Sequence, residues 1–289
     1  MKTNEEILAL MNEDMMLRNF SEVTKRDYIG RSFAFLQSTN KNAEDINERD
    51  IREYLIHLIK EKGLKEATVN TYNASLRFLF DVTLNRSLNC KQIPRMKQSR
   101  SLPEILTHDE LQRIFENASS LRDKTMFMTM YGSGLRISEL CNLKVSNIDS
   151  KSMRLFVDCS KGGRDRYTIL SQANLEQLRE YYKAYRPNHP DNWLFISRQK
   201  NQVSISAVQR AFRSAVNRSN INKSVTVHTL RASFATHMLE SGADIYLIKQ
   251  LLGHTHIQST TFYLCVTNFD PSIKSPLDLM PGKEVTEND

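Results

Sequence analysis

The stretch that decides the interpretation of this sequence runs from His228 to Tyr263 and reads HTLRASFATHMLESGADIYLIKQLLGHTHIQSTTFY. His228 and Arg231 are three residues apart, a spacing that places both on one face of a predicted helix. A second amphipathic run ends at Gly253, His254 follows it directly, and a third short apolar run carries the tyrosine. Each of these residues alone is typical of a packed or surface position. Their order and spacing as a set indicate a functional site.

The set resembles the signature of a known family. The order H-x-L-R, then L-L-G-H, then a tyrosine nine positions later is similar to that of the tyrosine recombinases, also called the phage-integrase family. Upstream, YGSGLRISEL (131–140) resembles the first arginine box of the family, and SKGGRDR (160–166) resembles its lysine hairpin. These matches follow the family's order and span nearly all of the C-terminal two-thirds of the chain.

Composition permits this interpretation without establishing it. The 289 residues include 40 Lys+Arg and 33 Asp+Glu, and the net charge of +7 is compatible with a polyanionic partner. The N-terminus is too acidic for a signal peptide, and no apolar run approaches the ~20 residues of a membrane span. We therefore expect a cytoplasmic protein without membrane contact. Neither a zinc knuckle nor a disulfide framework is indicated, because no C-x-x-C pair occurs among Cys90, Cys141, Cys159 and Cys265.

The first part of the chain predicts a bundle of helices. Apolar residues recur at helical spacing in four runs between residues 4 and about 85, and no strand pattern interrupts them. Beside the motifs above, residues 1–88 resemble the N-terminal SAM-like core-binding domain of the family, which grips DNA. Lys65 and Arg77 are the candidate DNA-facing residues. Residues 89–105 contain Pro94 and Pro103 and an excess of basic residues, which predicts a linker across a phosphate backbone.

Residues 106–269 predict the second domain. It begins at a capping box, Thr107 to Glu110, and continues through a methionine-rich helix that favours core packing. Gly132 and Gly134 are expected to bracket a turn before the next helix. Two strand-like runs flank residues 162–163, Gly-Gly, and predict a β-hairpin. The expected fold is mainly α with a small β-sheet, namely a helical bundle plus an α+β catalytic domain, followed by a tail at 270–289.

The resemblance implies that the chain is a site-specific recombinase that cuts and rejoins DNA. Arginine forks can match the charge that gathers on a reacting phosphoryl group, and a covalent tyrosine adduct conserves the energy of the broken bond. The family therefore needs neither ATP nor a metal, and no cofactor is expected. The implied roles are Tyr263 as nucleophile forming a 3′-phosphotyrosyl bond, Arg136 and Arg231 as phosphate clamp, Lys161 as general acid, His228 as general base or orienter, and His254 as donor to a non-bridging oxygen.

The implied partner is double-stranded DNA, bound by a homo-tetramer that joins two sites. Members of the family often pass a C-terminal element to the next subunit, and the apolar residues Leu277, Leu279 and Met280 are candidates for the anchor of such a tail. The biological role stays open between the integrase or transposase of a mobile element and a Xer-type resolvase of chromosome dimers. Ala232 and Cys265 stand where many relatives carry histidine, which weakens the Xer assignment. A catalytically idle DNA-binding protein and a type IB topoisomerase are more distant alternatives.

Overall fold

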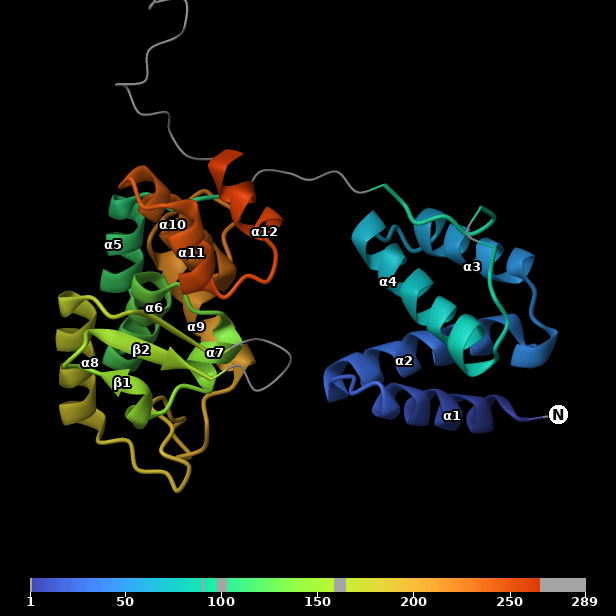
Figure 1. The fold of residues 1–289 in the computed structure, drawn as a ribbon, viewed down its shortest axis with the longest axis horizontal. Coiled ribbons are helices and arrows are strands. Elements are labelled where there is room, and N and C mark those ends of the chain that lie inside the picture. The colour runs from blue at the N-terminus through green and yellow to red at the C-terminus, as the bar shows by residue number, and fades with distance from the viewer. Residues whose placement is uncertain (1, 90, 98–102, 159–164, 266–289) are drawn as a thin grey trace, which may run out of the picture. The chain divides into compact units, whose positions relative to one another are not determined.

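The computed structural model describes residues 2–89, 91–97, 103–158 and 165–265 (Figure 1). The chain divides into two compact units, Met1–Ser101 and Leu102–Asp289. Each unit has its own hydrophobic core. Among the described residues, no helix combines the length and the apolar character that crossing a membrane requires.

The first unit is a bundle of helices, as its periodicity predicts. Its helices are α1 (Asn4–Leu17), α2 (Glu22–Thr39), α3 (Glu48–Lys60) and α4 (Glu66–Arg77), with a 3₁₀ turn at Ala43–Asp45 and a π-helical turn at Phe78–Thr83. Two of them begin at capping boxes, Thr3 with Glu6 and Asn47 with Asp50, because each pair satisfies backbone N–H groups that a helix start leaves unpaired.

The core of the first unit forms where the four helices meet. Its largest fully buried side chains include Phe35, Phe80 and Met11. Arg77 makes hydrogen bonds within this unit, since its guanidinium donates to Asn73 Oδ1 and to the carbonyl of Ile93. Of the two residues expected to face DNA, only Lys65 is exposed.

The second unit combines helices with one small antiparallel sheet. Its helices are α5 (His108–Glu116), α6 (Leu121–Ser133), α7 (Ile137–Cys141), α8 (Gln172–Tyr185), α9 (Ile205–Arg218), α10 (Val227–Glu240), α11 (Ile245–Leu252) and α12 (Gln258–Thr261), with 3₁₀ turns at Val145–Asn147 and Phe262–Cys265. The strands are β1 (Ile148–Asp149), β2 (Arg154–Val157) and β3 (Arg166–Ile169), in the order β1-β2-β3.

The strands β2 and β3 form the predicted hairpin, with Leu155 opposite Thr168. Strand β1 was not predicted, because a strand of two residues is too short to show an alternating pattern of apolar and polar residues. Helix α6 lies at the centre of the unit and packs against α5, α8, α9 and α10 (Figure 1). Phe127 of α6 meets Phe212 of α9 edge to face, with ring centroids 5.3 Å apart. Such pairs add to the stabilisation that burial of the rings supplies.

The turn after α6 differs from the predicted one and positions the site. Gly132 lies inside the helix, and only Gly134 takes a left-handed conformation, with φ +61°. A Cβ atom at Gly134 would lie 2.6 Å from the ring of Phe234 and 2.9 Å from Leu252. The backbone of this turn therefore lies directly against α10 and α11. Arg136 follows as the N-cap of α7.

Candidate active site

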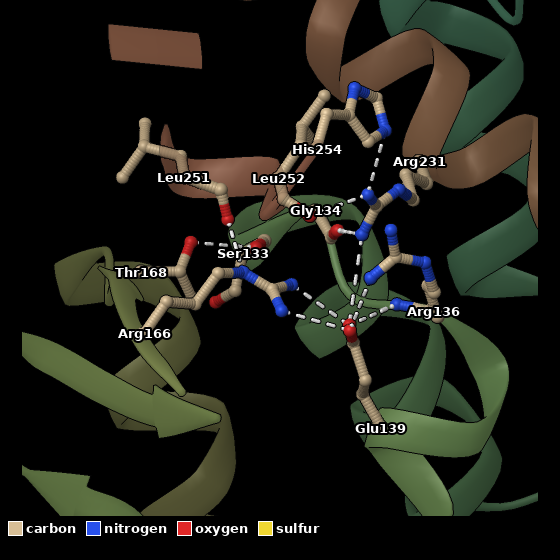
Figure 2. Close-up of polar contacts among 10 residues, drawn as sticks. All are labelled: Ser133, Gly134, Arg136, Glu139, Arg166, Thr168, Arg231, Leu251, Leu252 and His254. Carbon is tan, nitrogen blue, oxygen red and sulfur yellow. Dashed lines mark hydrogen bonds and ion pairs between the residues drawn. The ribbon is translucent and has the colours of Figure 1, made fainter. Parts of the chain in front are cut away.

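Side chains from four segments of the second unit converge at one place (Figure 2). Arg136 and Glu139 come from the start of α7, and Arg166 is the first residue of β3. Arg231 belongs to α10, and His254 follows the glycine that ends α11. Residues more than one hundred positions apart in the sequence thus share a single polar cluster.

Glu139 is the carboxylate that joins the arginines. Its oxygens accept from Arg136 Nη1 at 2.7 Å and from Arg166 Nη1 and Nη2 at 2.8 and 2.9 Å. Arg231 Nη1 lies 3.6 Å from Oε2. Burial alone would raise the pKa of Glu139, but the hydrogen bonds and positive charge of Arg166, with the backbone N–H of Arg136 and the charge of Arg231, lower it to about 2. Glu139 is therefore ionised at neutral pH.

Arg231 is buried and fixed by main-chain oxygens. Its Nη1 donates to the carbonyl of Gly134 at 2.8 Å, and its Nη2 donates to the carbonyl of Leu252 at 2.6 Å. Burial and the positive charges of Arg136 and Arg166 lower the pKa of Arg231, and Glu139 opposes this effect. The side chain thereby connects the turn after α6 to the end of α11 and holds its guanidinium in one orientation.

His254 is a neutral imidazole with a defined tautomer. Its Nε2 lies 3.0 Å from Arg231 Nη2, and because a guanidinium only donates, this nitrogen is the acceptor. The proton is then on Nδ1, which donates to Thr260 Oγ1 at 2.9 Å. Burial first, and then the charges of Arg231, Arg136 and Arg166, lower the pKa of His254 to about 4.

Tyr263 lies beside this histidine in the same subunit. Its ring is nearly parallel to that of His254, with centroids 6.4 Å apart and an interplanar angle of 17°. The tyrosine follows α12 in a 3₁₀ turn and packs against the small cluster of Phe234, Ile248 and Leu252. The proposed nucleophile therefore adjoins the arginine and histidine cluster without help from a second subunit.

Of the six residues that the sequence singled out, four are thus brought together: Arg136, Arg231, His254 and Tyr263. His228 is exposed in the first turn of α10, one turn before Arg231. Lys161 lies outside the described residues.

Sequence reasoning missed two members of the cluster, Glu139 and Arg166. The signal for Glu139 was present, because an acidic residue three positions after Arg136 forms a capping interaction with its backbone N–H. For Arg166 the sequence carries a weaker signal, since a basic residue within the hairpin motif looks like any exposed strand residue. Only the burial of its side chain identifies it, at 7% exposure.

The cluster suits an anionic ligand. Three guanidinium groups and one carboxylate leave an excess of two positive charges while His254 is neutral. The side chain of Arg136 is 38% exposed, so it is accessible to a ligand. A cavity of about 460 Å³ opens beside His254 and is also lined by Arg166, Lys249 and Gly253. Planar guanidinium forks of this kind match phosphate oxygens. Within the described parts of the chain, no group of three or more His, Cys, Asp or Glu residues could hold a metal ion.

Comparison with known proteins agrees with this chemistry. Residues 104–268 match the model of the phage integrase family, and residues 7–90 match that of the phage integrase N-terminal SAM-like domain. The chain is 38% identical over 274 residues to a putative integrase/recombinase, y4qK, of Sinorhizobium fredii, an alignment that covers 94% of this chain and 88% of the relative. It is 35% identical to the tyrosine recombinase XerA of Pyrococcus horikoshii, over 76% of each protein.

The fold is also found in a solved structure of a lambda integrase tetramer bound to a Holliday junction. The two chains superpose with a TM-score of 0.74 at 22% identity, and the alignment covers 91% of this chain and 77% of the integrase chain.

Proposed function

The chain belongs to the phage integrase family and is a tyrosine recombinase, and from that premise we propose how its own residues perform the reaction. Arg136, Arg231 and His254 bind the scissile phosphate, and Tyr263 attacks it. The observation that carries this assignment is the convergence of two guanidinium groups and the His254 ring, with the Tyr263 ring stacked on that histidine.

The reaction begins with attack of the Tyr263 oxygen on phosphorus. A 3′-phosphotyrosyl bond forms, the bond from phosphorus to the 5′-oxygen breaks, and Lys161 protonates the leaving oxygen. His228 accepts the phenol proton or orients the phosphate. Because the adduct conserves the energy of the phosphodiester, a 5′-hydroxyl of the partner strand can reverse the attack and rejoin the DNA without ATP.

His254 changes its role when the phosphate arrives. In the structure its Nε2 accepts from Arg231. A phosphate bound between the two residues brings negative charge, which raises the pKa of the imidazole. The protonated ring then donates from Nε2 to a non-bridging oxygen, while the Nδ1 hydrogen bond to Thr260 keeps the ring plane unchanged.

Covalent capture of DNA tests the nucleophile. The protein is incubated with a random-sequence duplex library and then denatured, so that only covalently bound strands stay with it. A nicked version of the recovered duplex then traps the adduct. We expect Tyr263→Phe to abolish the adduct and Tyr185→Phe, a change at a half-exposed tyrosine of α8, to leave it intact. Undiminished adduct in Tyr263→Phe contradicts the assignment.

The clamp has a separate test. We expect Arg136→Ala to retain DNA binding in a gel-shift assay. Its cleavage rate should fall by more than about 100-fold, because removal of a group that stabilises developing charge has an effect of this size. DNA binding by both wild type and Arg136→Ala, with strand exchange by neither, would favour a DNA-binding protein without catalysis. Relaxation of plasmids without site preference would indicate a topoisomerase.

We further propose that four copies join two duplexes, by analogy with the lambda integrase tetramer. The tail at 270–289, whose apolar anchor lies outside the described residues, would bind the neighbouring subunit. Deletion of 270–289 is expected to impair assembly on DNA, measured by light scattering, and to leave binding to a single site unchanged. A truncated protein that assembles normally removes the tail from this role.

For the biological role we propose integration or transposition of a mobile element, because the match to the putative integrase covers more of the chain than that to XerA. A Xer-type role in chromosome resolution is the second candidate. The captured DNA distinguishes them: repeats that flank the gene support an element, and a single chromosomal site elsewhere supports resolution.

A further inference from the structure

Arg166 is a buried cation that the reaction above does not use. It is the first residue of β3, and its side chain is 7% exposed. Both terminal nitrogens donate to Glu139, and Nε donates to the carbonyl of Leu251 at 2.7 Å (Figure 2). One side chain thus joins the sheet to the start of α7 and the end of α11.

The end of α11 is built around two arginines. Leu251 and Leu252 present successive carbonyl groups that a helix end leaves unpaired, and Arg166 binds the first while Arg231 binds the second. Gly253 then takes φ +66°, and a Cβ atom there would lie 2.8 Å from Cδ of Arg166. The arginine therefore fills the space directly beside the residue that precedes His254.

We infer that Arg166 is a positioning residue for strand cleavage, which holds His254 through the end of α11 and Arg136 through Glu139 in the arrangement that the phosphate requires. The inference rests on the proposed function and deepens it. The hairpin segment then has two roles, to supply the proposed acid Lys161 and, five residues later, to position the site through Arg166. Cleavage then depends on the hairpin as a support of the phosphate site as well as a source of a proton.

Charge provides a second link between Arg166 and the site. After burial and the charge of Arg231, the charges of Arg136 and Arg166 also lower the pKa of His254, whereas that of Glu139 raises it. Loss of Arg166 removes one of the cations that lower the pKa of His254. It also leaves the negative charge of Glu139, which raises that pKa, less neutralised. The His254 ring in DNA-free protein therefore reports whether Arg166 acts on the site as described.

The first test replaces Arg166 by lysine, which keeps the charge but cannot bind Glu139 through two nitrogens and Leu251 through a third. With the nicked duplex recovered by covalent capture, we expect adduct formation to slow by about 100-fold with DNA affinity within about twofold of wild type, because misplacement of catalytic groups by about 1 Å costs that much. Arg154→Lys, on the adjacent strand with an exposed ion pair to Asp149, is the control and should cleave normally.

A second pair of variants disturbs Arg166 without replacing it. Gly253→Ala places a methyl group against its Cδ, and Gly242→Ala, at φ +84° with nothing within 4 Å, imposes backbone strain alone. We expect slower cleavage only in Gly253→Ala, measured at a temperature at which both variants remain folded. This pair keeps the inference testable if Arg166→Lys does not fold.

NMR titration of His254 in DNA-free protein completes the test. Arg166→Gln should raise its pKa toward the ordinary value, and Arg154→Gln should not. The inference is overturned if Arg166→Lys and Gly253→Ala cleave within about twofold of their controls, or if their rates fall only in parallel with DNA affinity and melting temperature. If wild type forms no adduct, the proposed function fails instead, and the titration still decides whether Arg166 acts on His254.

Discussion

Glu139→Gln is the substitution whose consequence the structure defines most sharply. The change keeps the shape of the side chain and removes the carboxylate that accepts from Arg136 and Arg166. The pKa of Glu139 falls from 4.5 to about 2 in the folded protein. At about 1.4 kcal/mol per unit, this difference corresponds to about 3 kcal/mol of stability at pH 7. Breaking a buried ion pair by removing one partner costs a similar amount.

The pH dependence gives this prediction its specific signature. Since the folded pKa lies below the unfolded one, the contribution is complete above about pH 4.5 and is lost as the pH falls toward 2. The difference in unfolding free energy between wild type and Glu139→Gln should therefore fall to less than half of its neutral value, roughly 1.4 kcal/mol, by pH 3. At pH 7 the substitution Glu139→Gln should lower the melting temperature of the second unit by roughly 6–12 °C.

The assay is urea unfolding followed by the fluorescence of Trp193, the single tryptophan of the chain, which lies in the second unit. Glu176→Gln, at an exposed position of α8, is the control and should change the unfolding free energy by less than about 0.5 kcal/mol. A difference between wild type and Glu139→Gln that stays constant from pH 7 to pH 3, or is below about 1 kcal/mol at pH 7, would refute the reasoning.

Three further predictions use the same fluorescence signal or NMR. Gly134→Ala should destabilise the second unit by about 1–3 kcal/mol more than Gly242→Ala, because its methyl group would meet the ring of Phe234; equal effects would show that the turn can move. His254 should titrate near its pKa of about 4, and because its folded pKa is lowered, its contribution to stability should be complete above pH 6.5 and decline as the pH falls toward 4. If His254 titrated near 6.5, the claim that burial and the neighbouring cations lower its pKa would be wrong. Thr107→Ala should lower the unfolding free energy by about 1 kcal/mol through loss of its helix cap, and no change would remove that role.

Local chemistry made much of this fold predictable. The capping box at Thr107, the glycine stop at Gly253 and the two strands of the hairpin all follow from interactions within a few residues, and the structure confirms each of them. The prediction at Gly132 was wrong because a glycine inside a helix and one in a turn look alike in sequence. Gly134 takes the turn because only a residue without Cβ lets this backbone lie against Phe234.

The sequence by itself singled out Arg136, Arg231, His254 and Tyr263 as one set, because they stand in motifs that resemble those of the family, and the structure brings these four side chains together. Only the tertiary structure decided what holds them. Glu139 and Arg166 face each other across 27 residues of chain, and their importance comes from burial, which no local pattern encodes. A carboxylate and a guanidinium are ordinary on a surface, but out of water each requires the other, and this pair therefore holds the start of α7 against β3 beside Arg231 and His254.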